Sequence, residues 1–478
     1  MTDPEHGCAS GGMSLRGALQ GCRLGCEEDL PALRPPWALP RRCNYRAPHF
    51  LARASRLSGL GKIAFAFLWL LVFSIPWESA LMVPSVGTIA RLIGTLAGGF
   101  GVLAIFEKQS IRLPGPGHVL MTLFVIWAAA SYLWSSDPEQ TVVAATSYLQ
   151  LLVMVWLIWE FSSREREQTR LLQAYVLGTF VSGIDTVYQF LSHHEAAYQR
   201  YAGAGLNADD LGLTMALSIP VSYYLLIQSE GRAAWVYRLQ LVLAGTSILL
   251  SAARASFLAA LVALSIVPLT YGRSTWRQRI AIFPTVALLV CGGLFFVPAT
   301  SWERISTIPN ELAQGTLTGR TFVWAAGWGA FRAHPFLGVG AAAFGQSATR
   351  IVPIPSQQLK FFSVAAHNTF LSVLVEEGVT GFGLFCGLLC VLALSTKEMP
   401  PLPQKLWIVS LGVWLVGVSS LSWEVRKPTW FFFGLLLAQQ AGMVQKLRTS
   451  SHAPFLPTIN HPFCGHQNRE KSSFSSPK

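Results

Sequence analysis

Residues 236–271 read VYRLQLVLAGTSILLSAARASFLAALVALSIVPLTY, a nearly unbroken apolar stretch. A single α-helix over these residues would be ~54 Å long, whereas the hydrocarbon core of a bilayer is ~30 Å thick. We therefore predict two short membrane-spanning helices, residues 236–251 and 254–271, that meet in a turn at Ser251-Ala-Ala-Arg254. This turn places the guanidinium of Arg254 at the membrane surface or just below it.

The composition of the whole chain agrees with this local pattern. Of 478 residues, 52% are hydrophobic and 13% are charged, the mean hydropathy is positive, and 16 residues are Trp. Soluble domains contain roughly 25% charged residues, so about half of the usual charge is missing. The composition predicts an all-α integral membrane protein that crosses the bilayer many times.

Runs of about 20 apolar residues match the thickness of a bilayer core and recur along the chain. We predict twelve spans, with a large polar loop between the ninth and the tenth. The predicted spans are residues 62–82, 86–106, 115–134, 141–161, 170–191, 206–227, 236–251, 254–271, 279–298, 368–396, 404–421 and 428–445.

The distribution of Lys and Arg predicts the orientation, because cytoplasmic loops retain positive charge. Cations gather in alternate loops, on the same side as both termini, whereas intervening loops such as SSDPEQ (135–140) are poor in cations. Only Arg426 and Lys427 break the pattern. We therefore expect both termini in the cytoplasm and residues 299–367 in the periplasm, in the inner membrane of a bacterium. The net charge of +12 mostly reflects this asymmetry, so nucleic acid is not an expected partner.

The two ends of the chain carry few signals. Residues 1–61 lack helical periodicity, and the interpretation is a disordered cytoplasmic segment, with a start codon set too far upstream as the alternative. Residues 446–478 are expected to form a cytoplasmic tail. Two cysteine pairs, Cys22 with Cys26 and Cys386 with Cys390, have i, i+4 spacing but no nearby histidines, so no metal site is expected.

The polar interval Gly319–Gly381 contrasts with the apolar runs around it. Its arginines and histidines stand outside the bilayer, next to predicted helix ends, which favours an anionic, lipid-anchored substrate. A helical spacing of apolar residues predicts a short amphipathic helix, either on the membrane surface or packed on the bundle. These residues are Phe322, Trp324, Ala325, Trp328 and Phe331. We expect this helix to end near His334-Pro335. The basic residues of the interval are Arg320, Arg332, His334, Arg350 and His367.

Ionisable residues inside predicted spans are functional candidates, because burying an unpaired charge in a membrane is costly. Arg91 and Asp185 fall within spans, and for both we favour a structural role, as a helix–helix ion pair or by snorkelling, over a functional one. Asp209 and Asp210 begin the sixth span. His367 immediately precedes Asn368 at the outer start of the tenth span, where it serves either as a catalytic base or as part of a helix cap.

Several motifs together resemble the O-antigen ligase and polymerase superfamily, over roughly residues 62–445. Asp209 stands where that family usually has Asn, and Ala253 where it has Ser, which leaves the finer acceptor contacts in doubt. The matching segments are Asn207-Ala-Asp-Asp-Leu-Gly212 with Ser218-Ile-Pro220, Ala253-Arg254-Ala255, Arg320-x-x-x-Trp324, His334-Pro335-Phe-Leu-Gly338-Val-Gly340 with Phe344, and His367-Asn368-x-x-Leu371 with Glu376 and Gly378.

The resemblance implies a metal-independent, GT-C-like glycosyltransferase that needs no cofactor. Such an enzyme moves a glycan from a polyprenyl (undecaprenyl) diphosphate carrier to an acceptor at the outer face, where the acceptor is a lipid, a glycan chain or a protein hydroxyl. Apolar grooves between spans would hold the polyprenyl tail among the membrane lipids.

Elementary chemistry is consistent with these implied roles. Guanidinium groups bind a diphosphate leaving group bidentately, and Arg254 and Arg320 are the best candidates, supported by Arg332 or Arg350. A neutral imidazole near pH 7 suits a general base that activates an acceptor hydroxyl, which is the role expected of His367. Asn368 orients this imidazole or caps the helix.

Two other functions stay open at this point. A polysaccharide polymerase of the same superfamily shares the motifs quoted above. A transporter of a small anion would also have many spans with intramembrane Arg and Asp. A carrier should place its charges in mid-bilayer at broken helices with internal repeats, and no clear repeat is visible in this sequence.

Overall fold

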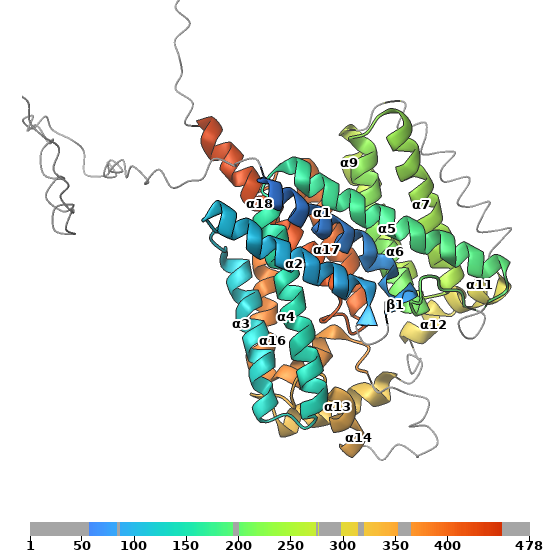
Figure 1. The fold of residues 1–478 in the computed structure, drawn as a ribbon. Coiled ribbons are helices and arrows are strands. Elements are labelled where there is room, and N and C mark those ends of the chain that lie inside the picture. The colour runs from blue at the N-terminus through green and yellow to red at the C-terminus, as the bar shows by residue number, and fades with distance from the viewer. Residues whose placement is uncertain are drawn as a thin grey trace, which may run out of the picture. The chain divides into compact units, whose positions relative to one another are not determined.

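The computed structural model describes residues 57–83, 87–194, 200–273, 276, 298–313, 320–351 and 365–451. Helices dominate these residues (Figure 1). The only strands that the structure describes are β1 (Met82–Val83) and β2 (Gly87–Thr88), a short antiparallel pair in which Met82 lies opposite Thr88. The predicted helical class is therefore confirmed. The expected terminal tails fall mostly outside the described residues, as do Cys22 and Cys26.

Among the described residues, eight helices are long and apolar enough to cross a membrane. They correspond to eight of the predicted spans, and the protein is therefore described as a multi-pass membrane protein. In chain order they are α1 (Gly59–Ser74) with η2 (Ile75–Ala80), α2 (Ile89–Lys108), α3 (Pro116–Ala130) with η3 (Ser131–Leu133), α4 (Pro138–Phe161), α6 (Ala208–Ile227), α7 (Gly231–Ser251), α16 (Thr369–Thr396) and α17 (Pro401–Val418).

The remaining predicted spans have different outcomes. The fifth and twelfth form long helices, α5 (Glu165–Leu191) and α18 (Lys427–Ser451), which are not among the eight because polar residues interrupt them. The eighth forms a shorter apolar pair, α8 (Arg254–Leu264) and α9 (Ile266–Thr270), followed by η4 (Tyr271–Arg273). The ninth, residues 279–298, lies almost wholly outside the described residues. The structure thus leaves the number of twelve unconfirmed.

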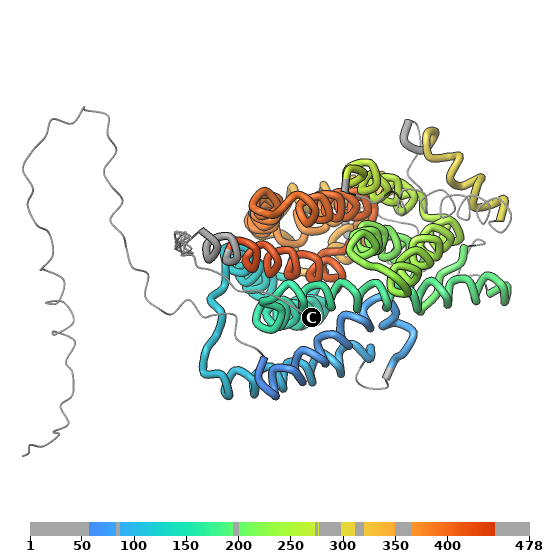
Figure 2. The backbone as a smooth tube through the Cα atoms, turned by 90° about the horizontal axis from the view of Figure 1, so that it is seen from above, coloured from blue at the N-terminus to red at the C-terminus, as the bar shows by residue number. Residues whose placement is uncertain are grey.

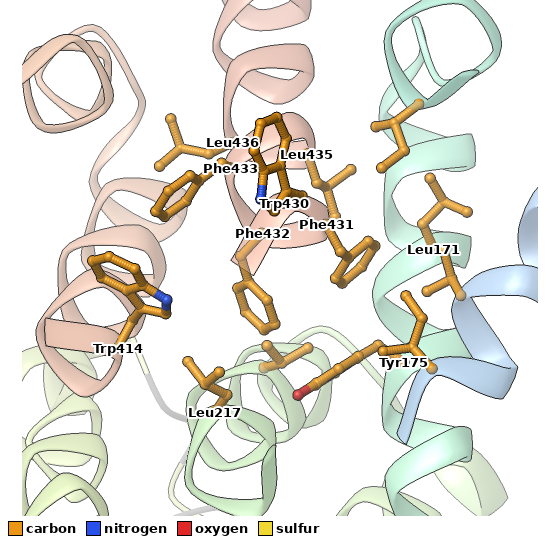
Figure 3. Packing of buried hydrophobic residues seen from close by; sticks show 14 of the residues in the cluster. Leu171, Tyr175, Leu217, Trp414, Trp430, Phe431, Phe432, Phe433, Leu435 and Leu436 are labelled. Carbon is orange, nitrogen blue, oxygen red and sulfur yellow. The ribbon is translucent and has the colours of Figure 1, made fainter. Parts of the chain in front are cut away.

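Helix α6 forms the centre of the packed core. Nearly all of its side chains are buried, and it packs against α5, α7, α8 and α17. Figure 2 shows α17 and α18, in orange to red, beside the green helices. In Figure 3, Phe431 and Phe432 of α18 point toward Tyr175 of α5, whereas Phe433 lies on the side of Trp414. Tyr175 and Phe431 stack at 5.4 Å between ring centroids. Because α6 is enclosed on all sides, its first turn is held rigidly.

The interval predicted as a large loop contains helices of its own. These are α11 (Ala299–Ser306), α12 (Ile308–Ala313), α13 (Arg320–Ala333) and α14 (Phe344–Ile351). Helix α13 is the predicted amphipathic helix, and it ends just before His334-Pro335, as expected. It turns the small residues Ala326 and Ala330 toward α14 and α16, whereas the rings of Phe322 and Trp328 are exposed. The packing face therefore combines these small residues with Phe331, whereas Phe322 and Trp328 lie on the exposed side.

The segment after α13 docks onto a break in α16. Gly378 interrupts α16 with φ 64° and ψ −172°, a conformation essentially restricted to glycine. The break frees two carbonyl groups, which accept hydrogen bonds from Val339 N (3.0 Å, Val375 O) and Gly340 N (2.9 Å, Glu376 O). The backbone of residues 339–340 thereby takes the place of the hydrogen-bond donors that α16 lacks at its break. These bonds fix α13 against the start of α16.

Candidate active site

The turn between α7 and α8 positions the first candidate residue. Helix α7 ends at Ser251 and α8 begins at Arg254, as the sequence predicts. Ala252 closes α7 in the left-handed region, with φ 49°. The half-buried Arg254 then donates from Nε to the carbonyl oxygen of Arg304 in α11, at 3.0 Å. The turn therefore connects the membrane bundle with the helices of the polar interval.

A second arginine ties this turn to the start of α6. Arg200 pairs with Asp209 (Nη2 to Oδ1, 2.7 Å) and donates from Nε to the carbonyl oxygen of Ser251 at 2.8 Å. Asp209 lies in the first turn of α6, where a carboxylate is favoured by the helix dipole. The Arg200–Asp209 pair thus holds the end of α7 and the start of α6 together.

Arg304 and Arg320 complete a group of four arginines with Arg200 and Arg254. Burial lowers the pKa of Arg304, and the charges of Arg200 and Arg254 lower it further. Burial also lowers the pKa of Arg320, where Asp209 opposes the effect and the same two arginines add to it. Arg304 and Arg320 therefore each lie within the electrostatic reach of Arg200, Arg254 and Asp209. The four arginines form a positive surface suited to an anion.

Arg320 is the first residue of α13, and it donates from Nη1 to the hydroxyl of Ser420. Ser420 belongs to the segment between α17 and α18, residues 419–426, which we call the α17–α18 connection. This bond fixes the start of α13 to the end of α17. Arg320 also lies near enough to His367 for its charge to lower the pKa of that histidine.

His367 is held between two anchored neighbours at the start of α16. The carbonyl oxygen of Ala366 accepts a hydrogen bond from Trp324 Nε1 at 2.8 Å, and the Asn368 side chain caps α16 by accepting from Leu371 N at 3.1 Å. His367 itself has φ 47°, an uncommon conformation for a residue other than glycine. Such strained positions often occur at functional sites.

The electrostatic surroundings of His367 favour the neutral imidazole. Burial lowers its pKa, and the charge of Arg320 lowers it further, while Asp209 and Asp210 act in the opposite direction. The pKa therefore lies below the usual value of 6.5, and the ring is neutral at pH 7. A neutral, half-buried imidazole beside guanidinium groups can accept a proton.

Asp210 anchors the α17–α18 connection to α6. Its carboxylate accepts from Trp423 Nε1 at 2.7 Å and from Asn207 Nδ2 at 2.8 Å, and it pairs with Arg426 Nη2 at 3.0 Å. A second contact joins the connection to α16, because the hydroxyl of Thr369 donates to the carbonyl oxygen of Leu421 at 2.8 Å. The connection is thus fixed both to α6 and to the start of α16, where His367 lies.

The structure brings together four of the predicted site residues: Arg254, Arg320, His367 and Asn368. Arg332 lies 12 residues beyond Arg320 on α13, ~18 Å along the helix axis, and its guanidinium lies 5.7 Å from the ring centroid of Trp328. Arg350 is in α14, and its side chain is outside the described part of the structure. The exposed His193, His194 and His334 do not enter the group.

Of the two ionisable residues predicted inside spans, Asp185 has a structural contact, and Arg91 lies near the start of its helix. Asp185 accepts a hydrogen bond from the backbone nitrogen of Ala204 at 2.6 Å, so it fastens the loop that follows α5. Arg91 lies in the first turn of α2, not in its middle. Among the described residues, neither forms a helix–helix ion pair.

Sequence reasoning did not assign Arg200, Arg304, Ser420, Trp423 or Arg426 to the site. One signal for the last of these was present, because Arg426 and Lys427 are the cations that break the charge asymmetry of the loops. The structure gives the reason: Arg426 pairs with Asp210, and Lys427 pairs with Glu78 at 2.6 Å. Cations that form ion pairs within a site therefore do not indicate how the chain is oriented in the membrane.

Residues 239–386 match the family model described as O-antigen ligase. The match begins in α7, ends in α16, and includes Arg254, Arg304, Arg320 and His367. No curated protein matches the chain. The match supports the superfamily resemblance found in the sequence, and with the apolar helices it supports a multi-pass membrane protein of O-antigen ligase-like function.

Proposed function

We propose that this protein transfers a glycan from a polyprenyl diphosphate carrier to a hydroxyl group of an acceptor at the outer face of the bacterial inner membrane. The family match supports the general reaction class. One observation carries the assignment of the site: His367, whose pKa is lowered, lies beside Arg320 and within the field of Asp209, the carboxylate that pairs with Arg200 and also acts on Arg320. A proton acceptor and an anion-binding surface are thus adjacent.

The proposed reaction is a single displacement at the anomeric carbon. The acceptor hydroxyl gives its proton to the neutral ring of His367 while its oxygen forms a bond to that carbon. The bond between the anomeric carbon and the diphosphate oxygen breaks, and its electron pair leaves with the diphosphate. Because one displacement occurs, the anomeric configuration is inverted.

The arginines stabilise the charge that develops on the leaving diphosphate. Arg254 and Arg320 are the proposed diphosphate ligands, and Arg200 and Arg304 add to the positive field. Planar guanidinium groups bind phosphate oxygens in pairs, and such preorganised charges lower the barrier most where water is excluded. In this proposal the guanidinium groups neutralise the diphosphate without a divalent cation.

The carboxylates have positioning roles in this proposal. Asp209 orients Arg200 through a contact of 2.7 Å, and Asp210 holds the α17–α18 connection. Both carboxylates also favour the protonated form of His367, which exists after the acceptor has given up its proton. The imidazolium is therefore stabilised at the point in the reaction where it forms.

The decisive experiment measures glycan transfer by the full-length protein in lipid nanodiscs, with a polyprenyl diphosphate-linked oligosaccharide as donor and an extracted cell-envelope lipid fraction as acceptor. We expect His367→Ala to lower kcat by about 10²–10⁴-fold, the usual contribution of a general base, without weakening donor binding. Arg254→Gln should weaken donor binding. Undiminished turnover in His367→Ala would contradict the role of the base.

Matched controls come from the same segments. His334→Ala removes an exposed imidazole that lies outside the group, and it should leave turnover unchanged. Arg332→Gln removes a guanidinium at the other end of α13. If Arg332→Gln weakens donor binding as much as Arg254→Gln does, the diphosphate site extends along α13, as the sequence alone suggests.

A further inference from the structure

A groove of about 580 Å³ lies between α1, α2 and α4, under the start of α18. We call it the α2–α4 groove. Its volume is typical of sites that bind small molecules or lipid chains. Leu71 of α1, Gly98 of α2 and Leu157 of α4 line its apolar part, and Glu78, Arg91 and Lys427 line its charged end.

The polarity of the groove changes in the same direction along both long walls. On α2 the lining begins with Arg91 and ends with Gly98 and Gly99. On α4, which crosses the membrane in the same sense as α2 in the predicted topology, the lining begins with Ser147 and ends with Leu157. A groove that is charged at one end and apolar at the other has the polarity of a lipid, with a headgroup and a chain.

The glycines of α2 leave space that helix packing does not require. A Cβ atom at Gly98 would lie 3.8 Å from Val153, an ordinary contact, and a Cβ atom at Gly99 would meet nothing within 4 Å. Gly101 is different, because its Cβ would lie 2.6 Å from Leu157. Close packing therefore explains Gly101, while Gly98 and Gly99 keep the groove open.

The charged end of the groove has an excess of positive charge. Arg426 pairs with Asp210 at 3.0 Å and Lys427 pairs with Glu78 at 2.6 Å, so the charge of Arg91 is the one in excess among the described lining residues. Arg91 has no acidic partner among the described residues. It also lies in the first turn of α2, where the helix dipole disfavours a cation. Helix stability does not account for Arg91, whereas an anionic ligand would.

The groove is connected to the candidate active site through Arg426. This residue lines the groove and pairs with Asp210 at 3.0 Å, and the charge of Asp210 acts on His367. The four arginines proposed to bind the donor diphosphate line no part of the groove. Two positively charged places therefore exist, one at the start of α13 and one at the start of α2, and the α17–α18 connection contacts both.

We propose that the α2–α4 groove binds the acceptor, as a lipid with a phosphate-bearing headgroup. This inference rests on the proposed function, because transfer between two membrane-borne substrates needs a second lipid site beside the base. The lipid chain lies against Gly98, Gly99 and Leu157, and the phosphate lies at Arg91. The apolar wall gives no selectivity among lipids, since all chains are equally apolar, so the cations at the charged end select the headgroup.

The test measures binding separately from transfer. The full-length protein, in nanodiscs of phosphatidylcholine, is irradiated with phosphatidic acid that carries a diazirine in its acyl chain, and labelled peptides are identified by mass spectrometry. We expect labelling of α2 and α4 by this probe, and weak labelling by the phosphatidylcholine analogue. Gly99→Leu should reduce labelling about tenfold, a change that corresponds to about 1.4 kcal/mol.

Gly383→Leu is the matched control, because a Cβ atom at Gly383 also meets nothing within 4 Å, yet this residue lies on α16 away from the groove. It should label like the unmodified protein. Arg91→Gln should reduce labelling by phosphatidic acid and leave labelling by phosphatidylcholine unchanged. In the transfer assay, both groove variants should raise the KM for the acceptor and leave the KM for the donor unchanged.

Equal labelling by the two probes would show that bulk lipid fills the groove, and it would overturn the proposal. So would an acceptor KM that does not change in Gly99→Leu and Arg91→Gln while transfer still depends on His367. If transfer does not depend on His367 while the labelling stays selective, the proposed function is contradicted instead. The two failures are therefore distinguishable.

Discussion

The imidazole of His367 illustrates how the site works at the scale of single residues. It occupies a strained backbone position, with φ 47°, between a buried alanine and a helix cap. Arg320 and burial keep it neutral, and the carboxylates of Asp209 and Asp210 favour its protonated form. This balance has a consequence for the pH dependence of the reaction.

We expect activity to persist below the pH at which an ordinary histidine becomes protonated. The base form of His367 exists above its pKa, and this pKa lies below 6.5. The fall of kcat/KM on the acidic side should therefore occur below pH 6.5. A pH–rate profile measured between pH 4.5 and 8 with the donor-linked oligosaccharide tests this expectation.

Two charge variants should move the acidic limb of that profile in opposite directions. Arg320→Gln removes a cation that lowers the pKa of His367, so the limb should move to higher pH. Asp209→Asn removes an anion that raises the pKa, so the limb should move to lower pH. Both variants will also reduce turnover, so only the position of the limb is compared. Identical positions would exclude His367 as the titrating group.

The indole of Trp423 gives a test of the α17–α18 connection. Trp423→Phe removes the N–H that donates to the Asp210 carboxylate, and hydrogen bonds to charged groups contribute about 1.5–3 kcal/mol. We expect a loss of stability of that order, together with lower activity, in thermal unfolding and transfer assays.

Trp407→Phe is the control for this variant. Its buried indole donates to the neutral side chain of Gln439 at 2.5 Å, so the expected loss is about 0.5–1.5 kcal/mol, with activity retained. Equal losses of activity in both variants would contradict a specific role for the Asp210 contact.

At this scale the sequence predicted part of the site. Arg254, Arg320 and His367 were found because each stands in a recognisable motif beside a helix end. Arg200, Arg304 and Ser420 stand in no such motif, and their roles depend on contacts across long separations in the chain. Arg304, for example, enters the group because its carbonyl oxygen binds Arg254, 50 residues earlier.

At the scale of elements, the break in α16 decides where α13 begins and ends relative to His367. The turn after α13 contains Gly338 and Gly340, and both have positive φ, at 73° and 104°. The sequence did not predict that this turn would dock on a second glycine in the next helix. An isolated glycine in an apolar run, such as Gly378, has no local pattern that distinguishes it from a packing residue.

Replacing Gly378 by alanine should disrupt this junction. The backbone conformation alone costs about 1–3 kcal/mol for a residue other than glycine, and a Cβ atom would lie 2.3 Å from the carbonyl oxygen of Phe336. We expect Gly378→Ala to lower the unfolding temperature strongly and to abolish transfer. Gly383→Ala, in open space on the same helix, should have neither effect. Stable, active Gly378→Ala protein would contradict this description.

Most helices were predicted from apolar runs alone, because length and hydropathy suffice when a helix faces lipid. One kind of element was mostly missed. The predicted large loop contains α11, α12 and α14 in addition to α13, which the aromatic spacing predicted. Helices outside the bilayer need only one apolar face, which is too weak a signal among strongly apolar spans.

At the scale of the whole molecule, the proposed orientation places every charged group of the site on one side of the membrane. The connections after α3, α5, α7 and α17 then face the periplasm, and those after α2, α4 and α6 face the cytoplasm. Exposed glutamates are available on both sides: Glu139 at the start of α4 and Glu303 in α11 on the periplasmic side, and Glu107 at the end of α2 and Glu230 before α7 on the cytoplasmic side.

Cysteine labelling in intact cells tests this orientation. In a variant without native cysteines, an impermeant maleimide should label Glu139→Cys and Glu303→Cys from outside. Glu107→Cys and Glu230→Cys should react only after the membrane is permeabilised. The reverse pattern would place the candidate site in the cytoplasm and would contradict transfer at the outer face.

The α17–α18 connection also matters for protein engineering and for the distribution of harmful mutations along the gene. It is 8 residues long, yet its second residue, Ser420, contacts Arg320 of α13. Its last residue, Arg426, contacts Asp210 of α6, and the next residue, Lys427, contacts Glu78 of η2. A fragment limited to residues 239–386 would lack the connection, together with Asp209 and Asp210. The activity therefore cannot be cut out and grafted onto another protein as a module. Deleterious substitutions will look scattered when they are mapped along the gene, and they will converge on one spot when they are mapped in space.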